Sequence, residues 1–160
     1  MPKSFRIPLF AAVVLWMAVI FAFSMETAAE SSHSSGTFIR TLFETFDRDF
    51  SVLSSAEQTG IIESWSFAVR KAAHFSVFCV LGILTASAVS TFRFSRRKTA
   101  LLSLAVCAAY AVSDEVHQYF VPGRACAVRD MLIDTCGAAF GILLVFFFIY
   151  IIRKIRNSSI

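Results

Sequence analysis

The chain has 160 residues, of which 57% are hydrophobic and only 16% are charged, and its formal net charge is +4. With a mean hydropathy of +0.69, this composition excludes an ordinary soluble domain and indicates one small membrane unit. The sequence pI near 9.1 does not predict nucleic-acid binding, because the basic residues lie beside apolar segments, where they orient a membrane protein.

Four apolar segments predict membrane-spanning helices, each of which needs roughly 20 residues to cross the hydrocarbon core. They cover residues 7–24, 72–91, 99–114 and 131–152. The apolar run of the first segment is longer than the roughly 7–15 residues of a signal h-region, so we expect this segment to be retained. The fold prediction is all-α, a four-helix transmembrane bundle in a single domain over residues 1–160.

Basic residues predict the orientation of the bundle, because Lys and Arg next to spans stay on the cytoplasmic side. They precede the first span, fill the "RFSRRK" connection between the second and third spans, and follow the fourth. The residues concerned are Lys3, Arg6, Arg93, Arg96, Arg97, Lys98, Arg153, Lys154 and Arg156. We therefore predict that both termini are cytoplasmic.

The segment between the first two spans divides into two parts. The Ser-rich "SMETAAESSHSSG" has the composition of a flexible loop. The following "TFIRTLFETFDRDF" places Ile39, Phe43, Phe46 and Phe50 at helical spacing, which predicts an extracytoplasmic amphipathic helix. This helix could lie in the membrane interface or pack on the protein, and the sequence leaves both open.

A second helix is expected to begin after Ser54, because Ser54 and Glu57 have the spacing of a capping box. We expect it to pass through Trp65, a typical interfacial residue, and to continue into the second span. Gly60 is a candidate kink within it.

Polar residues gather at one side of the predicted membrane. The second span opens with "RKAAHF", the third closes with "SDEVHQ" and the fourth opens with "RDMLID", and all three ends lie on the outer side in this topology. Ionisable residues at membrane depth usually face the bundle interior or a watery cavity. With the "VPGR" turn that follows the third span, the candidate site residues are Lys71, His74, Asp114, Glu115, His117, Gln118, Arg124, Asp130 and Asp134.

Chemical roles follow from the residue types. His74 and His117 are candidate general acids or bases, because histidine titrates near neutral pH, and Asp114 and Glu115 could orient them. The remaining candidates are expected to bind ligand, with the cations suited to a phosphate or carboxylate. They are Lys71, Gln118, Arg124, Asp130 and Asp134.

Structural interpretations compete with these roles. Asp114 and Arg124 could form an ion pair that holds the loop, and Arg70 could extend to lipid headgroups. We expect no metal ion and no other cofactor. A divalent metal would draw on His74, His117, Asp114 and Asp130, whose spacing matches no recognised ligand signature.

Small residues continue the polar face of the fourth span. From Asp130 and Asp134 the same helix face leads to Gly137 and Gly141, a Gly-xxx-Gly pair that lets another helix approach closely. Gly82 could serve the same close packing on the second span.

These patterns together resemble the VanZ-like family of small bacterial membrane proteins. The resemblance rests on "RKAAHF", "LG", "SDEVHQYFVPGR" and the "D...D..G...G" of the fourth span, in this order. It implies a four-helix protein of the bacterial cytoplasmic membrane, and the founding member is associated with teicoplanin resistance. The chain departs from the family pattern at Val77 and Phe78, where relatives commonly have Glu-Tyr, and at Asp134, where they commonly have Asn.

The family's characteristic polar positions match all of the candidate site residues above except Asp134. The resemblance and the polar cluster predict a cell-envelope protein that binds or processes a lipid-linked or peptidoglycan-precursor ligand, with membrane lipids as further partners and without nucleic acid. The main alternative is a non-catalytic accessory or scaffold protein whose polar cluster is structural. A proton or ion pathway is a third hypothesis. The sequence does not decide whether the protein is an enzyme, or how many copies assemble.

Overall fold

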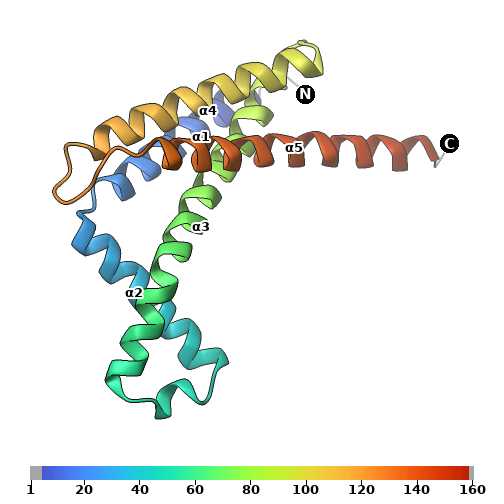
Figure 1. The fold of residues 1–160 in the computed structure, drawn as a ribbon. Coiled ribbons are helices and arrows are strands. Elements are labelled where there is room, and N and C mark those ends of the chain that lie inside the picture. Colours follow the sequence, from blue (N-terminus) through green and yellow to red (C-terminus); the bar gives the residue numbers. More distant parts are fainter. Residues whose placement is uncertain (1–4, 159–160) are drawn as a thin grey trace.

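The computed structural model describes residues 5–158, and within them the protein is all-α, as predicted (Figure 1). The elements are α1 (Arg6–Ser24), α2 (Ala28–Phe46), the short 3-10 turn η2 (Phe50–Val52), α3 (Ser55–Val89), α4 (Arg96–Gln118) and α5 (Val128–Ser158). Helices α1, α3, α4 and α5 are long and apolar enough to cross a membrane, which confirms the four candidate spans. The last three helices extend beyond the predicted spans at one or both ends.

Helix α2 corrects the predicted flexible loop, because the Ser-rich segment is helical from Ala28 onward. Thr27 caps this helix: its hydroxyl accepts a hydrogen bond from Glu30 N, and the Glu30 carboxylate accepts one from Thr27 N at 2.7 Å. The bond from the Thr27 backbone is the main reason that the pKa of Glu30 is lowered. Serine hydroxyls within the helix can donate to backbone carbonyls of the preceding turn, as Ser35 does to Ser32 O. The Ser-rich composition therefore did not prevent helix formation.

Helix α2 packs along the N-terminal part of α3, and Figure 1 shows the two as an arm that leaves the other helices. Ile39 is buried in this contact, and the Phe43 ring stacks on Phe50 and meets Trp65 edge-on. The amphipathic helix thus packs on protein through one face. It ends at Phe46, whose side chain is exposed, so the predicted apolar stripe is only partly buried.

Helix α3 begins as the sequence predicts. Ser54 and Glu57 form the capping box, with Ser54 N donating to the Glu57 carboxylate at 2.9 Å. The helix then continues over 35 residues, through Gly60 and Trp65, without a break. One helix therefore joins the arm to the membrane-spanning bundle.

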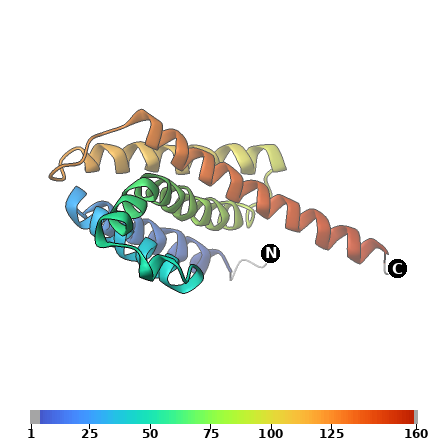
Figure 2. The same ribbon diagram turned by 60° about the horizontal axis from the view of Figure 1, so that its bottom comes forward.

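Helices α3 and α5 cross in both ribbon views and make the most extensive contact in the protein (Figure 1, Figure 2). The reason lies in the glycines. A Cβ at Gly82 would overlap the backbone of Ala138, and a Cβ at Gly137 or Gly141 would overlap the α3 backbone at Phe75 or Cys79. The predicted close approach of small residues is confirmed, and the contact is called the glycine seam below.

Helices α1 and α4 complete the core around buried α3 side chains such as Phe78 and Leu81. Trp16 of α1 donates its indole N–H to Val77 O at 2.8 Å, and the Tyr110 hydroxyl of α4 donates to Met17 O at 2.6 Å. Such bonds between helices fix the rotation of α1 against its neighbours.

The predicted orientation can be tested with the native cysteine Cys126, which lies exposed between α4 and α5. If the basic flanks are cytoplasmic, a membrane-impermeant maleimide should label the wild type in intact cells and should not label Cys126→Ser. Arg93→Cys in the Cys126→Ser background should react only after the cells are opened. Labelling of Arg93→Cys in intact cells would contradict the predicted topology and indicate the opposite orientation. Lys3, one of the predicted cytoplasmic residues, lies outside the described residues.

Candidate functional site

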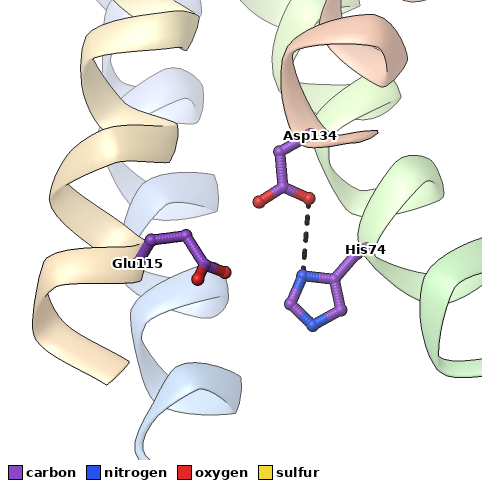
Figure 3. A group of neighbouring side chains, drawn as sticks. All are labelled: His74, Glu115 and Asp134. Carbon is purple, nitrogen blue, oxygen red and sulfur yellow. Dashed lines mark ion pairs between the residues drawn. The ribbon is translucent and has the colours of Figure 1, made fainter. Parts of the chain in front are cut away.

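Three of the predicted site residues point toward one another from three different helices. Figure 3 shows His74 of α3, Glu115 of α4 and Asp134 of α5, called the triad below. One side-chain nitrogen or oxygen atom of each residue lies within 4.8 Å of those of the other two, and His74 Nδ1 is 3.4 Å from Asp134 Oδ1. Polar residues of α3, α4 and α5 thus converge, as predicted, at the end of the bundle where α4 ends and α5 begins.

The triad carboxylates are fully buried, with Glu115 and Asp134 both 0% exposed. Glu115 Oε2 accepts a hydrogen bond from Ala127 N at 2.9 Å. Within residues 5–158, Glu115 Oε1 accepts no hydrogen bond, and neither does either oxygen of Asp134. Burying a carboxylate without donors or a counter-charge is costly, so two carboxylates facing one imidazole make an unusual arrangement.

Lys71 and Asp130 form a separate ion pair beside the triad. Lys71 Nζ donates to Asp130 Oδ2 at 2.6 Å, and both side chains are largely buried. The same ammonium lies 5.3 Å from the centre of the Phe67 ring. The charge of Lys71 is therefore already matched by Asp130.

Gln118 connects the α4 end to the following loop. Its amide donates to Asp114 Oδ2 at 2.9 Å and to Ser24 Oγ at 3.2 Å, while its Oε1 accepts from Arg124 Nη1 at 3.1 Å. Arg124 Nε also donates to Glu26 O at 3.0 Å. The structural alternative of a direct Asp114–Arg124 ion pair is not found within residues 5–158, because Gln118 lies between the two groups.

The chain reverses at the predicted "VPGR" turn. Gly123 has a φ of 76°, a conformation that side chains with a Cβ rarely adopt. A Cβ there would also lie 3.0 Å from Ala28. The turn carries Arg124 back toward the helix ends, as the Pro and Gly predicted, and places it beside the residues that follow α1.

His117 does not join the triad. Its ring lies against Phe21 of α1, with centroids 4.4 Å apart, and its Nε2 is buried without a hydrogen bond from the described residues. Arg70, for which the sequence favoured lipid headgroups, donates to Ser32 Oγ of α2 at 3.0 Å.

A cavity of about 600 Å³ lies between α1, α2, α3 and α4. Much of its wall is apolar, formed by Ile20, Phe23, Phe38, Val69, Ala72, Ala73, Val77 and Phe78. The polar groups in the wall are Ser24, Glu26, Ser31, Ser34, Ser35, Arg70, His74, Ser76, Asp114 and Arg124. His74 thus belongs both to the triad and to the cavity.

Sequence reasoning did not include the α2 side of this cavity. Arg70 and the α2 serines line it, but the Ser-rich segment was interpreted as a loop and so had no inward face. The signal that could have shown it is the Thr27–Glu30 spacing, which is the same capping pattern that located the start of α3.

Four long apolar helices with a His/Glu/Asp cluster buried between them define a multi-pass membrane protein with a polar centre inside its helix bundle. The sequence profile of the VanZ/LLP1 family matches residues 9–150, and the chain belongs to this family. The match includes every residue of the triad and confirms the resemblance. No curated protein and no solved structure shows a significant match.

Proposed function

We propose that this protein binds a lipid-linked ligand of the cell envelope, such as a peptidoglycan precursor, in the cavity between α1, α2, α3 and α4. The observation that carries the proposal is the mixed wall of the cavity. Apolar side chains suit a lipid chain, and a few convergent polar groups suit a headgroup.

The charges of the wall favour a headgroup with both acceptors and donors. Arg70 and Arg124 each have guanidinium N–H groups beyond the hydrogen bonds described above, and a guanidinium suits phosphate or carboxylate. Asp114 and Glu26 supply carboxylates that accept from hydroxyl, amide or amine groups. A phosphate joined to a sugar or peptide satisfies both requirements, whereas a simple fatty acid satisfies only one.

His74 is the group best suited to move a proton if the ligand is processed. It lines the cavity, and Asp134 contacts its Nδ1 at 3.4 Å, an arrangement that can orient the ring of a general acid or base. His117, the other histidine of the predicted site, lies against Phe21. We therefore assign the acid or base role to His74 in this proposal.

A scaffold function is the second candidate, and the Gln118 network favours it. Gln118, Asp114 and Arg124 largely satisfy one another and join α1, α4 and the following loop. Polar residues with these bonds are explained by stability alone. In this case the cavity would hold no specific ligand.

The proposal is tested by filling the cavity. Ala73 lines it, whereas Ala68, also exposed on α3, does not. Protein purified with Ala73→Phe should lose the lipid species that co-purify with the wild type, because the phenylalanine occupies the space of the lipid chain. Ala68→Phe should retain them. Mass spectrometry of the extracted lipids measures both, and equal lipid content in the two variants would support the scaffold function instead.

The same variants test the resistance hypothesis taken from the family. If ligand binding underlies an effect on teicoplanin susceptibility, Ala73→Phe should remove that effect at unchanged membrane abundance. The Ala68→Phe protein should keep it.

A further inference from the structure

The triad contains more buried negative charge than the described residues compensate. Asp134 and Glu115 are 0% exposed, and three of their four oxygens accept no hydrogen bond from residues 5–158. The nearest ammonium, on Lys71, is bound to Asp130 at 2.6 Å. One imidazole can supply at most one positive charge for two carboxylates.

We infer that His74, Glu115 and Asp134 bind one divalent transition-metal ion, and zinc is the ion we expect to bind most readily. The donors are one nitrogen and carboxylate oxygens, a set used by zinc and related first-row metals. A divalent cation would balance both carboxylates and would supply the missing partner of their buried oxygens.

The distances fit this ion. Zinc lies about 2.0–2.2 Å from nitrogen and oxygen ligands, so two ligands at a tetrahedral angle are about 3.4 Å apart. His74 Nδ1 and Asp134 Oδ1 are 3.4 Å apart, and one ligand atom of each triad residue lies within 4.8 Å of those of the other two. Rotation of the Glu115 side chain would bring one of its oxygens to ligand distance and complete the set.

The surroundings hold two of the ligands in place. Ala127 N donates to Glu115 Oε2, and Oε1 accepts no hydrogen bond within residues 5–158. The Glu115 carboxylate points toward the other two residues (Figure 3). Asp134 lies one helical turn from Gly137, where α5 touches the α3 backbone next to His74. Hydrogen bonds and packing that orient metal ligands are a usual feature of metal sites.

This ligand set differs from the four residues considered on sequence grounds. Asp130 pairs with Lys71, Asp114 accepts from Gln118, and His117 lies against Phe21, so only His74 remains from that set. Glu115 and Asp134 replace the others. Three protein ligands would leave a coordination position for water or a ligand group, as in catalytic zinc sites. With the ion bound, His74 would be a ligand, and a water in that position would take over the acid or base role given to His74 above.

The inference goes beyond the proposed lipid ligand and does not depend on it, because the metal content can be measured on purified protein alone. Full-length protein with a histidine-free affinity tag would be treated with EDTA, dialysed against zinc sulfate and then freed of unbound metal. We expect about one zinc ion per wild-type chain by elemental analysis, and a higher unfolding temperature with zinc than with EDTA.

Variants locate the ion. Asp134→Asn and Glu115→Gln should weaken zinc binding by about ten-fold or more and should remove the thermal shift. Glu63→Gln is the control, since it removes one exposed carboxylate of α3 outside the triad and the cavity and should bind zinc as the wild type does. In EDTA, Asp134→Asn should unfold at or above the wild-type temperature, because it removes one buried charge; this shows that a loss of zinc is not a loss of folding.

Two results would overturn the inference. One is a wild-type protein with less than about a tenth of an ion per chain and no thermal shift with zinc, manganese, cobalt or ferrous iron. The other is zinc binding of equal strength in wild type, Asp134→Asn and Glu115→Gln, which would put the ion elsewhere. Failure of the lipid experiment with normal zinc binding would reject the proposed ligand and leave the metal site in place.

Discussion

Gly141→Leu should destabilise the helix bundle by more than any other single change on α5 that we consider. A Cβ at this position overlaps the carbonyl of Cys79, and a backbone group cannot move aside by changing rotamer. Helices α3 and α5 must therefore separate along the glycine seam. Overpacking of a core costs about 1–3 kcal/mol, and a seam of backbone contacts should lie at the upper end of this range or above it. Thermal unfolding in detergent measures the loss.

Gly60→Leu is the matched control for this experiment. Gly60 lies on α3, and a Cβ there meets nothing within 4 Å. Because glycine is a poor helix former, the substitution should leave the unfolding temperature unchanged or raise it. Gly36, which the sequence placed in a loop, is a poorer control, since it lies in α2 and a Cβ there would lie 3.5 Å from Ile62 Cγ2. Equal unfolding temperatures for Gly141→Leu and the wild type would contradict the close backbone contact of α3 and α5 at Gly141.

Gln118→Leu should cost about 3 kcal/mol of stability, because it leaves a buried carboxylate without a hydrogen-bond donor from the described residues. Gln118 donates to Asp114, whose other oxygen already accepts no hydrogen bond within residues 5–158. It also accepts from Arg124, so two charged groups lose a partner at once. Unfolding temperature and membrane abundance should both fall.

A second substitution identifies the cause. Adding Asp114→Asn to Gln118→Leu should recover part of the lost stability, because a neutral amide is less costly to bury than a carboxylate. The double-mutant cycle gives the coupling between the two positions. If the double variant is no more stable than Gln118→Leu alone, the loss comes from packing or from Arg124 and not from the Asp114 charge.

Most of the fold could be predicted because its determinants are local or repeated along the chain. Apolar length located α1, α3, α4 and α5, and the capping box at Ser54 located the start of α3. Spacing on one helix face identified Gly137 and Gly141 as packing positions. Composition misled at α2, where the Ser-rich sequence suggested a loop, although Thr27 and Glu30 form the capping box of a helix.

The site could be predicted only to the level of a layer of polar residues. Helix ends that meet in one layer follow from topology, but the rotation of α4 follows from its packing on several neighbours at once. That rotation turns Glu115 toward His74 and Asp134 and turns His117 toward Phe21, although Glu115 and His117 are only two positions apart. Asp134, where the chain departs from the family pattern, lies in the triad.

The glycine seam also determines how the triad is held. Glycine and alanine have no side-chain rotamers to lose, so these positions of the seam come into contact without a side-chain conformational entropy cost. It is also unable to adapt, because Gly137 meets the Phe75 backbone directly and no flexible side chain lies between them. His74 precedes Phe75 and Asp134 lies one turn before Gly137, so the separation of the two is set by a rigid contact. His74 and Asp134 are therefore preorganised: an arriving ion or headgroup need not order these two residues.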